Sequence, residues 1–288
     1  MRQARHTAIT LAGLLTLALV VNCSGPGSSG GDSVLTSPIV VGTVNDAPGF
    51  DTGTINQSGF DIDVMKNIGA AQNAKTVSTI IDYASRESGL LDGSLKLVIA
   101  TYSITPERNQ KGIDFAGPYM VSPQALLVRA DDKRFTHKAA LKDKSVCTVE
   151  GSTGSRTKIP GANMATQVQT TQDCLNLLDR SDTDAVFSDA LILYGYVNSN
   201  PTKYQVVLPG VFGELQYTGI GILGGHHADC AKLDELVSAF LDNQWAQDFK
   251  NNFPVAAQKY SGADTSTGDY QSIFKPTAQD MQRLSCKL

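Results

Sequence analysis

The sequence predicts an α/β protein with mostly parallel sheets, and two observations lead to this fold class. From about residue 38 onward, short apolar runs typical of β-strands alternate with segments whose apolar residues recur at helical spacing. Such alternation builds βαβ units, whose strands run side by side in the same direction. The 288 residues are also enough for one large or two ordinary domains with a substantial core.

The expected strands are apolar runs bounded by polar or glycine-rich residues. In chain order they are 39–43, 95–104, 124–130, the beginning of 145–155, the beginning of 183–197, 204–208 and 217–224. Several of them are apolar at consecutive positions, which indicates strands buried on both faces.

The expected helices are 59–71, the second part of 183–197, and 230–253. In the first helix, Phe60, Val64 and Ile68 fall on one face. Asp61 and Asp63 lie in its first turn, where the helix dipole favours acidic side chains. One face of the last helix carries Leu233, Leu236, Val237, Phe240, Leu241, Trp245 and Phe249. The chain beyond this helix is polar and rich in turn residues, so we expect it to wrap on the surface.

The net charge of the chain limits the kinds of partner that it is expected to bind. It carries 24 basic and 28 acidic residues, a formal charge of −4. A mildly acidic protein with few basic clusters is a poor match for a polyanion, so nucleic acid is not an expected partner.

The N-terminus predicts export. Residues 1–22 have a basic start followed by an apolar run, 8–21, that is shorter than the roughly 20 residues a membrane-spanning helix needs. The run ends at Cys23 in an order that resembles a bacterial lipobox, although Asn22 departs from the small residue usual before the cysteine. We therefore expect a signal peptide, lipidation of Cys23 and a flexible Gly/Ser tether over 23–37, which would anchor the protein to the outer face of the cell membrane. The alternative is an ordinary secretory signal with a chance cysteine.

Four further cysteines fit an exported protein. An even number in such a chain indicates two disulfides, for which three connectivities are possible. The pairing Cys147–Cys174 is favoured because both lie within one structural unit, and Cys230–Cys286 would tie the polar tail to the last long helix. No Cys/His spacing typical of a zinc site is present, so we expect no metal.

Three polar segments follow expected strands, where open α/β sheets bind their ligands. They contain Ser103 and Arg108, Thr153 and Gly154, and Asp189. Hydroxyls and free backbone N–H groups can bind an anion, and a guanidinium can donate two parallel hydrogen bonds to a carboxylate. An aspartate opposite them can accept an ammonium group. Together these residues are the parts needed to hold the zwitterionic head of an amino acid.

The same segments resemble a known family. GFDIDV at 59–64, LVIATYSITPER and IDFAGPY within 97–119, VCTVEGSTGS at 146–155 and DAVFSDALIL at 184–193 are similar to the polar amino-acid group, family 3, of bacterial extracellular solute-binding proteins. These proteins capture substrates for ABC importers. The likeness runs in register from about residue 38 to 253 and is nearest to glutamate-binding lipoproteins of actinobacteria.

The resemblance implies a periplasmic-binding-protein type II fold, an α/β fold of two lobes joined by two crossover strands that act as hinges. The implied parts are lobe one at 38–121 plus 222–253, lobe two at 122–221, a tail at 254–288 tied to the last helix, and crossovers near Tyr119–Val121 and Tyr217–Ile220.

The resemblance also implies roles for single residues. Arg108 would grip the ligand α-carboxylate with help from Ser103, Thr153 and Gly154, and Asp189 would take the α-ammonium. The remaining implied contacts are an aromatic face from Tyr83, a backbone contact at Thr101, and a second carboxylate partner at Arg86. The last of these favours glutamate, with glutamine and aspartate as the alternatives.

The expected function is therefore binding by cleft closure and delivery to an ABC permease, without catalysis and without a cofactor. Two alternatives use the same fold. One is a sensory lipoprotein that reports amino-acid levels to a membrane receptor. The other is a dehydratase acting on cyclic carboxylates, for which Glu150 would be the general acid.

Overall fold

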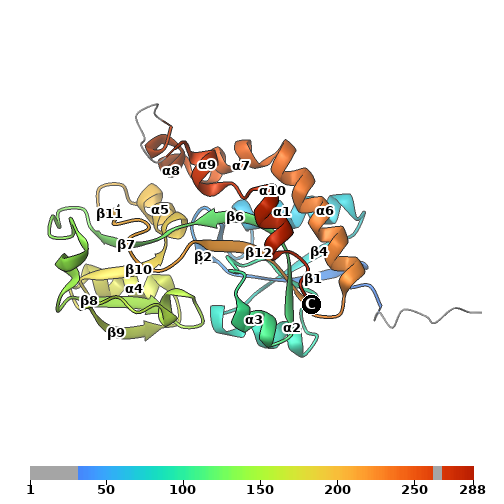
Figure 1. Ribbon diagram of the computed structural model, residues 1–288, viewed down its shortest axis with the longest axis horizontal. Coiled ribbons are helices and arrows are strands. Elements are labelled where there is room, and N and C mark those ends of the chain that lie inside the picture. The colour runs from blue at the N-terminus through green and yellow to red at the C-terminus, as the bar shows by residue number, and fades with distance from the viewer. Residues whose placement is uncertain (1–31, 262–267) are drawn as a thin grey trace, which may run out of the picture.

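In the computed structural model, which describes residues 32–261 and 268–288, the chain forms two five-stranded sheets, each with its own helices (Figure 1). The predicted signal peptide, Cys23 and the tether up to residue 31 lie outside the described residues. We call the first sheet and its helices lobe one and the second sheet and its helices lobe two.

The sheet of lobe one has the strand order β4-β1-β5-β12-β6. The strands are β1 (Ile39–Thr43), β4 (Thr76–Ile80), β5 (Leu97–Val98), β6 (Ile113–Ser122) and β12 (Gln216–Leu223). β1 runs parallel to β4 and β5, whereas β12 runs antiparallel to β5 and β6. A small hairpin of β2 (Asp46–Ala47) and β3 (Asp51–Thr52) follows β1. The helices are α1 (Phe60–Ala71), the short 3-10 helix η1 (Tyr83–Ser85), α2 (Arg86–Leu91), α3 (Pro106–Gln110), α6 (His227–Asn243) and α7 (Trp245–Asn252).

The sheet of lobe two has the order β11-β7-β10-β8-β9. Its strands are β7 (Gln124–Arg129), β8 (Ser145–Val149), β9 (Asn163–Val168), β10 (Ala185–Asp189) and β11 (Tyr204–Val207). β8 runs parallel to β10 and β9, and β7 runs antiparallel to β10 and β11. The helical segments are η2 (Lys138–Leu141), η3 (Gly154–Arg156), α4 (Thr171–Asp179) and α5 (Ala190–Ser199). Both sheets are thus mixed, with a parallel centre and antiparallel strands beside the connections between the lobes.

The two connections between the lobes lie side by side. β6 leads into β7, and the chain returns from β11 through β12, so that Tyr217 pairs with Val121 and Thr218 with Met120. The register shifts between Thr218 and Ile220. The segments predicted as crossovers are therefore neighbouring parts of one antiparallel pair, which belongs to the sheet of lobe one.

Two expected elements differ in extent from the structure. The predicted strand 95–104 is a strand only at Leu97–Val98, and the chain then leaves the sheet, reaching a left-handed φ of 47° at Thr101. The predicted helix 230–253 is two helices, because α6 ends at Asn243 and α7 begins at Trp245. Its apolar face is nevertheless buried as expected, apart from Leu236, which is partly buried.

The tail is more ordered than its composition suggests. It contains α8 (Pro254–Lys259), α9 (Tyr270–Phe274) and α10 (Ala278–Leu284). Tyr270 and Phe274 are buried, and both rings stack on Phe249 of α7. These few aromatic residues fix the tail, although most of their neighbours are polar.

The end of the tail covers β6, the edge strand of lobe one. The Cys286 N–H donates to the carbonyl oxygen of Phe115 at 2.7 Å, and the Lys287 N–H donates to Oδ1 of Asp114 at 2.8 Å. An edge strand exposes unpaired main-chain groups, and the Cys286 contact satisfies one of them, the carbonyl of Phe115. The predicted disulfides Cys147–Cys174 and Cys230–Cys286 are confirmed, and the second one joins this tail to α6.

Candidate ligand-binding site

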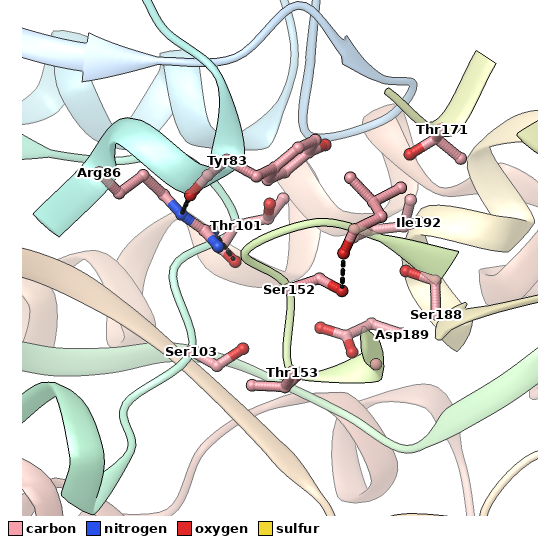
Figure 2. Close-up of a pocket in the computed structure, with 12 residues that line it drawn as sticks. Tyr83, Arg86, Thr101, Ser103, Ser152, Thr153, Thr171, Ser188, Asp189 and Ile192 are labelled. Atoms are coloured by element: carbon pink, nitrogen blue, oxygen red, sulfur yellow. Dashed lines mark hydrogen bonds between the residues drawn. The ribbon is translucent and has the colours of Figure 1, made fainter. Parts of the chain in front are cut away.

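Polar side chains from both lobes line one cavity, as expected for strand ends that meet at one edge of each sheet (Figure 2). The lining residues are Tyr83, Arg86, Thr101, Ser103, Val149, Ser152, Thr153, Gly154, Thr171, Ser188, Asp189 and Ile192. All residues predicted from the sequence as ligand contacts are among them except Arg108. The free volume is about 20 Å³, room for about one water molecule. An amino acid therefore requires the two lobes to move apart.

Arg86 lies at the wall of the cavity with only 2% of its surface exposed. Its Nε donates to the Tyr83 carbonyl at 2.9 Å, and its Nη1 donates to the carbonyls of Ala100 and Thr101 at 3.0 and 3.2 Å. Its Nη2 donates to the carbonyl of Gly151 at 3.0 Å. The guanidinium also lies 5.1 Å from the centre of the Tyr83 ring. Burial lowers the pKa of Arg86 to about 10, which leaves the side chain charged at neutral pH.

Arg108 lies behind this wall and is fully buried. Its Nε forms an ion pair with Oε1 of Glu87 at 3.0 Å, and its Nη1 donates to the Ser103 carbonyl. Its Nη2 donates to the Gly151 carbonyl at 3.2 Å. Burial works against the charged form of Glu87, but the Arg108 and Arg86 guanidiniums hold its pKa below the usual value. Nothing in the local sequence links Glu87 to Arg108, so this ion pair was not predicted.

The carbonyl of Gly151 therefore accepts hydrogen bonds from two arginines of the opposite lobe. Gly151 has a left-handed φ of 73°, which glycine adopts freely. A Cβ at this position would come within 2.7 Å of the main chain of Ala84. Glycine is thus needed here both for the turn and for the close approach of the two lobes.

Asp189 faces the arginines from lobe two. It is the last residue of β10, and its carboxylate is directed into the cavity (Figure 2). Burial raises its pKa to about 7, while a hydrogen bond from Gln124 and the charges of Arg86 and Arg108 limit the rise. A cation next to this carboxylate would stabilise its ionised form, because the cation would replace the interactions with water that burial removed.

Thr153 and Gly154 provide a polar loop on the same side. The loop follows β8, and Gly154 begins η3. Oγ1 of Thr153 accepts a hydrogen bond from Nε2 of Gln124 at 3.3 Å. The glycine packs tightly, since a Cβ there would lie 3.1 Å from the carbonyl oxygen of Phe187.

The ring of Tyr83 forms part of the cavity wall between Arg86 and Thr171 (Figure 2). Its hydroxyl is buried and forms no hydrogen bond of good geometry with the residues that the structure describes, although the Asp46 carboxylate lies near it, and burial and this carboxylate together raise its pKa. A buried hydroxyl without a well-formed hydrogen bond is unfavourable, so a polar group of a ligand could improve its contacts.

A second set of contacts joins the lobes beside the cavity. Oδ2 of Asp46 in lobe one accepts the N–H of Thr171 at 2.8 Å, at the start of α4 in lobe two. The hydroxyl of Tyr196 donates to the main-chain carbonyl of Asp46. Gly195 lies so close to Pro48 that a Cβ would come within 1.7 Å of the Pro48 carbonyl oxygen. None of these contacts between the lobes was predicted from the sequence.

The cavity is lined by charged groups of both signs, which suit a ligand that also carries both charges. Positive groups of lobe one face a carboxylate of lobe two across hydroxyl-bearing walls. Glu150, which would be the general acid of a dehydratase, is exposed and does not line the cavity. Within residues 32–261 and 268–288, no cluster of histidine, cysteine and acidic side chains could hold a metal ion. Over the same residues, no helix has the length and apolar character needed to cross a membrane.

Comparisons with known proteins agree with this architecture. Residues 39–273 match the family model of bacterial extracellular solute-binding proteins, family 3. The glutamate-binding protein GluB of Corynebacterium efficiens is 31% identical over 262 residues, which cover 84% of this chain and 86% of that protein. GluB of Corynebacterium glutamicum is 32% identical over 256 residues, covering 82% and 85%. A solved solute receptor for L-cysteine from Neisseria gonorrhoeae superposes with a TM-score of 0.69 at 21% identity, over 77% of this chain and 92% of that one. The shared fold is the periplasmic-binding-protein type II fold.

Proposed function

Because the chain belongs to the bacterial extracellular solute-binding proteins of family 3, we propose that it captures a polar amino acid outside the cell and delivers it to an ABC permease. L-Glutamate is the favoured ligand, with glutamine and aspartate as alternatives, because two relatives of this chain are named glutamate-binding proteins. The lipid anchor at Cys23 belongs to the same proposal, since a tethered receptor stays close to its permease.

The observation that carries the proposal is the pair of guanidiniums that converge on one acceptor opposite Asp189. The Nη2 groups of Arg86 and Arg108 both donate to the Gly151 carbonyl. When the lobes part, that carbonyl leaves, and both groups become free to bind a stronger acceptor. A carboxylate is such an acceptor, because charged hydrogen bonds of this kind are stronger than those to a neutral carbonyl.

In the proposed complex the ligand lies between the lobes. Arg108 holds the α-carboxylate together with Ser103, and Arg86 holds the distal carboxylate of glutamate. Closure then brings Thr153 and Gly154 to the α-carboxylate and Asp189 to the α-ammonium. Exclusion of water strengthens each charged contact. No step in this sequence makes or breaks a covalent bond.

The ligand is identified by differential scanning fluorimetry against the twenty amino acids. We expect L-glutamate to raise the melting temperature most, because a ligand that binds only the folded state stabilises it. If none of the amino acids shifts the melting temperature, the proposed function is wrong.

The two arginines are tested by calorimetry. Arg108→Ala is expected to weaken glutamate and glutamine alike by about 2–5 kcal/mol, because the α-carboxylate would be buried without its partner. Arg86→Ala is expected to weaken glutamate more than glutamine. The control is Arg180→Ala, since Arg180 is an exposed arginine of lobe two that pairs with Asp182 on the surface. Equal losses of glutamate and glutamine in the Arg86 variant would exclude Arg86 as the side-chain partner.

A further inference from the structure

Asp61 has a buried carboxylate that does not cap the helix in which it lies. It lies in the first turn of α1 and is fully buried. Its Oδ2 accepts the main-chain N–H of Thr101 at 2.7 Å, and its Oδ1 accepts the hydroxyl of Tyr119 at 2.8 Å. Both partners lie at functional places, since Thr101 lines the ligand cavity and Tyr119 lies on β6, the strand that leads into lobe two.

The conformation of Thr101 explains why such a partner is needed. Thr101 has φ of 47°, and left-handed backbone is unfavourable for a β-branched residue. A hydrogen bond from its N–H to an ionised carboxylate is among the strong ones available in a protein. The carboxylate of Asp61 therefore offsets the strain and keeps the peptide at Thr101 in this orientation.

The orientation of Thr101 in turn sets the position of Arg86. The carbonyl oxygens of Ala100 and Thr101 both accept from Nη1 of Arg86. If the backbone at Thr101 relaxed to a negative φ, the neighbouring peptides would rotate and this guanidinium would lose acceptors. Burial raises the pKa of Asp61 to about 6, and the nearby charge of Arg86 limits this rise.

We propose that Asp61 is a positioning residue for ligand binding: it holds Thr101 in the left-handed conformation that aims Arg86 and the cavity wall, and it ties them to the strand leading into lobe two. This inference rests on the proposed function, because its readout is the affinity for an amino acid.

The test is a double-mutant cycle between Asp61→Asn and Thr101→Gly, read by calorimetry at pH 8. Glycine adopts φ above zero without strain, so it removes the need for a carboxylate at this point. Asp61→Asn is expected to weaken the binding of L-glutamate by about tenfold when residue 101 is threonine, the equivalent of the strain released. With glycine at 101 the same substitution is expected to weaken binding by less than about threefold.

The control is Asp63→Asn in the same helical turn. Asp63 accepts a hydrogen bond from Nδ2 of Asn252 and has no contact with Thr101. It is expected to leave the affinity unchanged. If Asp61→Asn does not fold, Tyr119→Phe takes its place in the cycle, since it removes one of the two hydrogen bonds that hold the Asp61 carboxylate. A less constrained carboxylate holds the Thr101 N–H less firmly, so we expect a smaller loss of affinity that again shrinks when residue 101 is glycine.

The outcomes separate the two proposals. A purely structural role for Asp61 would lower the melting temperature of the variant without changing the affinity of the folded protein, and would overturn the inference. An equal loss of affinity in the threonine and glycine backgrounds would overturn it as well. If the wild-type protein bound none of the twenty amino acids, the proposed function would fail first and this inference with it.

Discussion

At Asp189, burial determines the pH range in which an ammonium group can bind. The pKa of this carboxyl is raised to about 7 in the ligand-free protein because the group has lost most of its water. Only the ionised form pairs favourably with the α-ammonium of a ligand. Binding must therefore release a proton whenever the pH lies below this pKa.

We expect the affinity for L-glutamate to be constant above about pH 8 and to fall by up to tenfold for each unit of pH below about 7. Calorimetry in buffers of different ionisation enthalpy measures both the affinity and the proton released. Asp189→Asn is expected to bind weakly and to lose this pH dependence. A wild-type affinity that does not change between pH 5.5 and 8 would contradict the role of Asp189.

Glu87 shows how a residue can matter without any signal in its local sequence. Its partner Arg108 follows it by 21 positions and sits on a different helix. The sequence predicted Arg108 as the residue that binds the ligand α-carboxylate, and in the closed structure this arginine is fully buried behind the cavity wall. The prediction that Arg108 binds the α-carboxylate stands as a proposal, and it requires the lobes to open.

At the scale of elements, α5 limits how closely the lobes can meet. Its residue Gly195 packs against the carbonyl of Pro48 from lobe one, with no space for a Cβ. Within lobe two, by contrast, alanine is the better helix former by about 1 kcal/mol. A change from glycine to alanine should therefore affect closure more than folding.

Gly195→Ala is expected to weaken ligand binding by about tenfold or more, since overpacking of this kind disfavours the closed state by about 1–3 kcal/mol. The melting temperature of the ligand-free protein is expected to change little, because its lobes can part and relieve the contact. Calorimetry and scanning fluorimetry measure the two effects separately. Asn198→Ala, on the exposed part of the same helix, serves as the control. Wild-type affinity in Gly195→Ala would show that this contact does not limit closure.

The tail depends on a disulfide as well as on its aromatic residues. The Cys230–Cys286 bridge closes a loop with a sequence separation of 56, and the Cys147–Cys174 bridge one of 27. The longer the loop, the more conformational freedom a disulfide removes from the unfolded chain.

Replacing Cys230 and Cys286 with serine is expected to lower the free energy of unfolding by up to about 4 kcal/mol. Urea denaturation measures the loss. Amide hydrogen exchange at positions 286 and 287, whose N–H groups bond to the β6 segment, should rise in the same variant. Unchanged exchange there would show that the tail holds the edge strand without the bridge.

At the scale of the whole molecule, several buried carboxyls share one electrostatic consequence. Burial raises the pKa of Asp51 to about 8, of Asp61 to about 6 and of Asp189 to about 7. In the unfolded chain each returns to a pKa near 3.8. Between these values the folded protein binds more protons than the unfolded chain, so a rise in pH favours unfolding.

We therefore expect the free energy of unfolding of the ligand-free protein to decrease from pH 5 to pH 8, by as much as about 1.4 kcal/mol per pH unit for each carboxyl within its range. Urea denaturation across this range measures the slope. Asp51→Asn is expected to reduce it, whereas substitution of the exposed Asp242 is not. Stability that increases with pH over this range would show that these carboxyls are not the dominant groups.

In the closed arrangement of the two lobes, contacts between the lobes occupy the ligand-binding site. The cavity is much smaller than an amino acid, and its guanidiniums are occupied by the Gly151 carbonyl of the other lobe. Ligand binding thus exchanges one set of contacts for another. The affinity reports the difference between these two sets rather than the sum of the ligand's own contacts.

The roles of Tyr83, Thr101 and Arg86 at the cavity came from the resemblance to a family, and the observed disulfide pairing was favoured among three possible ones. The sequence by itself determined the α/β fold class, several of the strands and helices in their order, the buried faces of α1 and α6, and the polar residues Ser103, Thr153, Gly154 and Asp189 of the cavity wall. These features depend on the periodicity of neighbouring residues and on where polar groups follow a strand, so they can be read along the chain. Only the tertiary structure decided that Asp61 supports Thr101, that Glu87 pairs with Arg108 and that Gly151 and Gly195 allow the lobes to meet. The reason is physical, since each of these contacts joins groups far apart in sequence, and its energy exists only once burial has removed the water between them.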